Sequence, residues 1–171
     1  KLSTNPIFNK LIDIMMHKKT NICFYCNFKN IRDIVKYVNI VGPYICILKI
    51  NSFDIDNFNM NYISALEKLA KGHNFMILND INISSINTNN FIWAHITTIS
   101  HYNTVNIINN MKNYFLKNNK QLLLNSAFME DNNSIIIQNK DIFLGYIQND
   151  NKYTLQNDKD ELKQDKLLKS N

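Results

Sequence analysis

A single carboxylate stands where a barrel enzyme would carry its charged side chains. Asp80 closely follows the apolar run of residues 75–78. The polar residues that come next are all uncharged: Asn82, Ser84, Ser85 and Asn87. In barrel enzymes the catalytic residues lie at the ends of several strands. The stretch therefore has the arrangement of a strand-end active site and very little of its chemistry.

Cysteine and histidine provide two further candidates for chemistry. Cys23 and Cys26 form a CxxC pair, which is compatible with a redox or zinc site. They lie in an expected buried strand, where positions three apart face opposite sides, and no second CxxC or CxxH follows. His95 and His101 lie on or after another expected strand, without a Cys or carboxylate partner at a recognisable spacing. We therefore expect structural cysteines, Cys46 included, and no metal site.

Glycine-rich phosphate loops are missing from the sequence. The three glycines are Gly42, Gly72 and Gly145, and none belongs to a GxGxxG or GxxxxGK motif. Loops that cradle phosphate need glycines where the backbone approaches the anion. We therefore expect no nucleotide cofactor, and no other cofactor is indicated.

The spacing of apolar residues predicts helices that alternate with strands. Helices are expected over residues 5–19, 30–41, 59–74 and 103–117, the second ended by Gly42 and Pro43 and the third by Gly72. Strands are expected over residues 20–28, 44–50, 75–79, 94–100 and 121–128. A further strand or a hairpin is expected within residues 134–147, after a polar gap too short for a helix. This alternation is typical of an α/β fold with parallel strands.

Four segments resemble orotidine 5′-monophosphate (OMP) decarboxylase of the eukaryotic type. They are NPIFNKLIDIMMHKKTNIC (5–23), VGPYICILKINSFDI (41–55), LEKLAKGHNFMILNDINISSINT (66–88) and FIWAHITTISH (91–101). The words GPYIC and LAKxHNF are specific to this family. The resemblance implies an incomplete TIM-type (β/α) barrel of about six strands that lacks the last two. Residues 1–150 would form this degenerate barrel domain, and residues 151–171 a charged C-terminal tail or helix.

The family's chemistry rests on a Lys-Asp-Lys-Asp array, in which the central Lys protonates the carbanion left by loss of CO₂. By position, the resemblance retains Lys49 as the first Lys and Asp80 as the first Asp. The central Lys falls on Asn82, which carries no charge and donates no proton near neutral pH. The second Asp falls on Ser85. Half of the array is therefore replaced, including the proton donor.

Three further family positions are also changed. The family's His after the second strand falls on Asn51, and the Asp two residues later falls on Phe53. The ribose-binding Asp of the first strand falls on Asn27. In addition, the segment between Thr88 and Phe91 is about ten residues shorter than in the family, and the loops that hold phosphate in such barrels follow the last two strands.

These changes predict a catalytically inactive pseudoenzyme that serves as a structural or interaction subunit of a larger assembly, rather than an enzyme. Lys49 and Asp80 would then be remnants, nucleotide binding is not expected, and the partners would be other protein subunits. A homodimer is also compatible with the family. The open seam of the barrel could be covered by a hairpin, by the tail or by another subunit.

Two alternatives stay open. The chain could still bind a pyrimidine nucleotide or be a weakly active OMP decarboxylase of UMP biosynthesis. It could also be associated with a ribonucleoprotein, because the net charge is +5 and the pI about 9.0. Against nucleic-acid binding, Arg32 is the only Arg that could form a phosphate fork.

Composition also bears on the origin and location of the chain. Asn and Ile make up about a third of its residues, which suggests an AT-rich genome. No apolar run approaches the ~18 residues of a membrane span, so no membrane association is expected. Three unpaired cysteines suit a reducing compartment inside the cell. We expect the cytoplasm, or an organelle if a targeting peptide has been removed.

Overall fold

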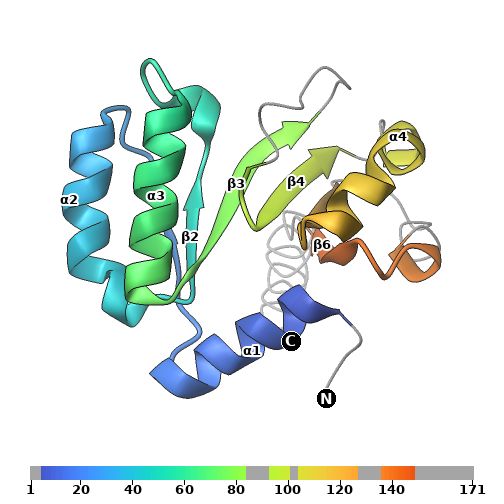
Figure 1. Ribbon diagram of the computed structural model, residues 1–171, viewed down its shortest axis with the longest axis horizontal. Coiled ribbons are helices and arrows are strands. Elements are labelled where there is room, and N and C mark those ends of the chain that lie inside the picture. The colour runs from blue at the N-terminus through green and yellow to red at the C-terminus, as the bar shows by residue number, and fades with distance from the viewer. Residues whose placement is uncertain (1–4, 84–92, 101–103, 127–135, 149–171) are drawn as a thin grey trace, which may run out of the picture.

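Six parallel strands form one open sheet in the computed structural model, which describes residues 5–83, 93–100, 104–126 and 136–148 (Figure 1). Each strand pairs with the next along the chain. The strands are β1 (Cys23–Tyr25), β2 (Ile47–Ile50), β3 (Met76–Ile83), β4 (Ile96–Ser100), β5 (Gln121–Ser126) and β6 (Phe143–Gln148). This architecture confirms the predicted α/β fold of about six strands. The predicted tail, residues 151–171, lies outside the described residues.

The helices are α1 (Pro6–Lys18), α2 (Ile31–Val41), α3 (Met60–His73) and α4 (Thr104–Lys117), with 3₁₀ turns η1 (Gly42–Tyr44) and η2 (Ser52–Asp54). Asparagine side chains cap the amino ends of three of them. Asn5 accepts hydrogen bonds from two backbone N–H groups of α1, and Asn30 and Asn59 each accept one from α2 and α3. The asparagine-rich composition therefore also serves helix initiation.

The end of α3 differs from the prediction. Gly72 lies inside the helix, which continues to His73. Asn74 follows in the left-handed conformation, with φ 54°, and its N–H bonds to the carbonyl of Ala70. Asparagine tolerates this conformation better than most residues, so it ends the helix where glycine was expected.

The core consists of three clusters on the two faces of the sheet. α2 and α3 pack side by side on one face, around Ile34, Leu66 and Ile77. α4 packs around Phe115 and Leu122. α1 crosses the end of the sheet where the strands begin and packs on the other face, where it contacts residues of β2 to β6 (Figure 1). α1 therefore leaves uncovered the carboxyl ends of the strands, which are the ends that carry charged side chains.

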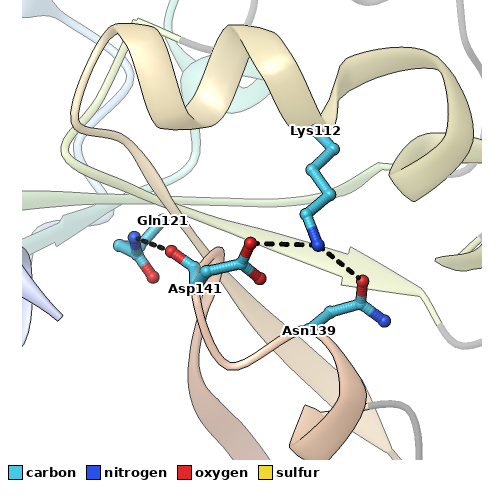
Figure 2. A network of polar contacts seen from close by, with 4 residues as sticks. All are labelled: Lys112, Gln121, Asn139 and Asp141. Atoms are coloured by element: carbon cyan, nitrogen blue, oxygen red, sulfur yellow. Dashed lines mark hydrogen bonds and ion pairs between the residues drawn. The ribbon is translucent and has the colours of Figure 1, made fainter. Parts of the chain in front are cut away.

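A polar network fixes the start of β6 (Figure 2). Lys112 of α4 pairs with Asp141 at 2.9 Å and donates to Asn139 Oδ1 at 3.2 Å. Gln121 of β5 donates to the carbonyl of Asp141 at 2.9 Å. β6 pairs with β5 in parallel, and the alternative of a hairpin within residues 134–147 is wrong. A helical turn at residues 136–138 precedes β6.

Within the described residues, no helix combines the length and apolar character needed to cross a bilayer. All three cysteines are free thiols. Cys23 lies in β1 and is exposed, whereas Cys26 follows this strand, which is shorter than the predicted 20–28, and is buried.

Candidate functional site

Lys49 and Asp80 meet at the ends of adjacent strands. Lys49 lies near the end of β2, and Asp80 lies within β3, which extends beyond the predicted boundary at residue 79. The distance from Lys49 Nζ to Asp80 Oδ2 is 2.6 Å, with 29% and 23% of the two side chains exposed. The structure thus brings together the two charged residues that the sequence singled out, as a partly exposed ion pair.

The aromatic ring of Tyr25 lies beside this ion pair. It lies opposite Lys49 in the pairing of β1 with β2, and Lys49 Nζ lies 5.2 Å from the centre of its ring. An ammonium at this distance is attracted by the negative face of the ring. Tyr25 was not among the predicted site residues. Its place at the end of the first strand, one strand away from Lys49, was the available signal.

Cys23 lies two residues before Tyr25 and so faces the same side of the sheet. Desolvation raises the pKa of the Cys23 thiol. The positive charge of Lys49 opposes this shift, while Asp80 and Cys46 add to it. Cys23 is therefore predominantly a neutral thiol at neutral pH, and the ion pair is the charged part of the site.

Asn79 and Ser52 form a buried pair behind the site, also missed in the sequence analysis. Asn79 Oδ1 accepts from the backbone N–H of Ser52 at 3.1 Å, and Asn79 Nδ2 donates to Ser52 Oγ at 3.1 Å. Both residues are almost fully buried. Only the register of β2 against β3 brings them together, so no sequence signal indicated the pair.

His95, a weak metal candidate, lies at the opposite end of the sheet, next to the start of β4. Its Nδ1 accepts a hydrogen bond from the backbone N–H of Ile77 at 3.1 Å. Burial, together with the smaller effect of the positive charges of Lys10 and Lys120, lowers the pKa of His95 to about 4. His95 is therefore neutral, with its proton on Nε2. In the described part of the chain, no three His, Cys, Asp or Glu residues gather as metal ligands; His101 lies outside it.

Comparisons with known proteins agree on one family. No protein-family model matches the chain. Orotidine 5′-phosphate decarboxylase of Torulaspora delbrueckii is 37% identical over 83 residues, or 48% of this chain and 31% of the relative. The enzyme of Rhizopus oryzae is 25% identical over 169 residues, or 86% of this chain and 64% of the relative. The chain is an orotidine 5′-phosphate decarboxylase-like homologue. It spans about a third of the length of the more similar relatives.

A solved structure supports the same fold. The crystal structure of putative orotidine 5′-phosphate decarboxylase from Streptomyces avermitilis matches 76% of this chain and 56% of its own chain, with a TM-score of 0.56 and 13% identity. At this identity the match concerns the fold alone. Together with the six parallel strands, it identifies the sheet as an incomplete TIM-type barrel.

The positions that differ from the resembled family lie before and after Lys49 and Asp80 in the sequence. Asn27 is exposed after β1, and Asn51 caps η2 by accepting from the N–H of Phe53 at 3.0 Å. Asn82, which by the resemblance falls at the position of the decarboxylase's central Lys, belongs to β3. Ser85 lies outside the described residues. Among the described residues, Lys49 is the salt-bridge partner of Asp80.

Proposed function

We propose that this decarboxylase-like protein does not turn over OMP and serves as a structural or interaction subunit of a larger assembly. The observation that carries the proposal is the ion pair itself. Lys49 lies against Asp80, while Asn occupies position 82 of the same strand. By the resemblance, position 82 would supply the proton that replaces CO₂ on the pyrimidine ring. An asparagine amide cannot supply it.

The remaining ammonium is a poor substitute for this donor. Lys49 belongs to the neighbouring strand and is already engaged by Asp80. General acid catalysis contributes about 10²–10⁴-fold to a rate, and its loss at this step would reduce turnover by about that factor. Loss of the second carboxylate, at Ser85, would lower preorganised electrostatic stabilisation further.

An interaction role is supported by the edges of the sheet. In the described residues, β1 and β6 each pair with a strand on one side only. Ile22 and Tyr25, next to and within β1, are each 51% exposed. Unpaired strand edges with apolar neighbours favour association with another chain.

A decarboxylation assay with OMP tests the proposal that the protein is catalytically inactive. We expect the purified chain to release no CO₂ above the background of the Lys49→Ala variant, while an active decarboxylase assayed in parallel turns over. Turnover that Lys49→Ala abolishes would contradict the proposal. Sedimentation analysis tests whether the assembly includes self-association, and a chain that stays monomeric at all concentrations would contradict that form of the assembly role.

A second function, the binding of a pyrimidine nucleotide without reaction, is favoured by the exposure of the ion pair. Lys49 and Asp80 can each offer a hydrogen-bonding group to a polar ligand at the open ends of the strands. A ligand at 100 times its Kd would stabilise the protein by about 2.7 kcal/mol. Thermal unfolding with UMP should then show a shift that Lys49→Ala removes and that AMP does not produce. No shift at millimolar UMP would exclude this function.

A further inference from the structure

Asp80 occupies an irregular point of the sheet. The regular pairing of β2 with β3 ends at Ile50 and Asn79. On the other side of β3, the register with β4 shifts between Asn79 and Ile83. Asp80 therefore lies one residue beyond the last regular pair on both sides. The ladder of backbone hydrogen bonds alone does not determine where its carboxylate lies.

Asn79 directly precedes Asp80 in the strand and is held by hydrogen bonds. Its side chain faces away from Asp80, because successive residues of a strand point to opposite faces. Ile77, two residues earlier, packs with α2 and α3, whereas Leu78 packs with α1 on the other face. Asn79 thus lies behind the sheet and cannot touch a ligand bound at Lys49 and Asp80.

The partner of Asn79 belongs to the segment that follows Lys49. Ser52 is the first residue of η2, and Asn51 caps this turn by accepting from the N–H of Phe53. The two hydrogen bonds between Asn79 and Ser52 therefore join the end of β2 to the end of β3. Because both residues are buried, breaking these bonds leaves polar groups unsatisfied and favours a rearrangement of the two strand ends.

We propose that Asn79 is a positioning residue, whose paired hydrogen bonds to Ser52 hold the ends of β2 and β3 so that Lys49 meets Asp80 on the opposite face. The inference concerns the geometry of the ion pair and is independent of the function proposed above. It assigns a role in the site to a residue that cannot contact any ligand there.

Lysine acetylation in the folded protein tests this role. A short pulse of acetic anhydride, followed by mass spectrometry, gives the rate at each lysine. Lys112 is the matched internal control, because it pairs with Asp141 in the other half of the sheet and has similar exposure, 34% against 29% for Lys49. Asp80→Asn gives the rate of Lys49 without its partner. Ile142→Val, in the core beneath α4, controls for a general loss of stability.

We expect Asn79→Leu to raise the rate at Lys49 toward that of Asp80→Asn, by up to about fivefold, the upper range for partly exposed ion pairs. The rate at Lys112 should not change. Ser52→Ala removes one of the two hydrogen bonds and should produce a smaller increase. If Asn79→Leu does not fold, the rate at Lys49 in Ser52→Ala decides whether the bonds between Asn79 and Ser52 position Lys49. An unchanged rate at Lys49, or a parallel increase at Lys49 and Lys112, would show that Asn79 contributes only to general stability.

Discussion

Lys49 Nζ lies 2.6 Å from Asp80 Oδ2, so the two charges on neighbouring strand ends neutralise each other. The Tyr25 ring lies 5.2 Å from the same ammonium and, among the described residues, borders this ion pair. By the resemblance, the pair occupies the positions of two catalytic residues of the decarboxylase family, and each charge has the other as its partner.

The energetic coupling of this pair should be small. We expect Lys49→Ala and Asp80→Ala to lower the free energy of unfolding by less together than the sum of the single changes, with a coupling of about 0.5 kcal/mol. The reason is that solvent screens both partly exposed groups. Urea unfolding of the four proteins measures it, and the coupling should decrease in high salt. A coupling of several kcal/mol would contradict this account of the site.

His95 should contribute to the pH dependence of the free energy of unfolding. Its pKa is lowered to about 4 in the folded protein, so the unfolded chain binds a proton first as the pH falls below about 6.5. Stability is then lost between pH 6.5 and 4, by up to about 3 kcal/mol from this residue. Urea unfolding at several pH values measures the loss.

His95→Asn, which retains a hydrogen-bond acceptor for the N–H of Ile77, should reduce this acid-induced loss. His17→Asn, at the exposed end of α1, is the control and should leave it unchanged. Equal acid sensitivity in the His95 variant and the unmodified protein would show that carboxylates alone cause it.

Two glycines should respond oppositely to alanine. A Cβ atom at Gly42 would lie 2.7 Å from His73 Cγ, so Gly42→Ala should lower the free energy of unfolding by about 1–3 kcal/mol through overpacking. A Cβ at Gly72 meets nothing within 4 Å, and Gly72 lies inside α3. Gly72→Ala should therefore stabilise the protein by about 1 kcal/mol. Thermal unfolding of both variants checks the opposite signs; two changes of the same sign would contradict the packing around His73.

Asn5 should contribute more than an ordinary helix cap. It caps α1, and its Nδ2 also donates to the buried Gln121 Oε1 at 2.8 Å. Asn5→Ala should cost about 2–4 kcal/mol, the sum of a lost cap and an unsatisfied buried group. Asn30→Ala, which removes only the exposed cap of α2, should cost about 1 kcal/mol. Equal losses in chemical denaturation would mean that Gln121 finds another donor.

The order of elements could be predicted because apolar periodicity is local. Each helix from α1 to α4 lies within one residue of its predicted bounds. The direction of β6 could not be predicted, because it depends on pairing with β5, which only the folded sheet reveals. Likewise, the extension of β3 to Ile83 depends on the pairing of Ile83 with Ile99 of β4 rather than on the polar residues the strand contains.

The site was predictable only in part. Lys49 and Asp80 could be named from the resemblance, and their contact follows from the pairing of β2 with β3. Tyr25, Asn79 and Ser52 could not be assigned, because their contacts depend on register and on which face of the sheet each occupies.

The strand order also has a consequence for synthesis on the ribosome. Each strand pairs with the strand that precedes it in the sequence, so the sheet can gain one strand at a time as translation proceeds. The first helix is the exception, since Asn5 must wait for Gln121, 116 residues later. The amino end of α1 thus gains this partner only after β5 has been made, although its apolar face can already pack against β2 and β3.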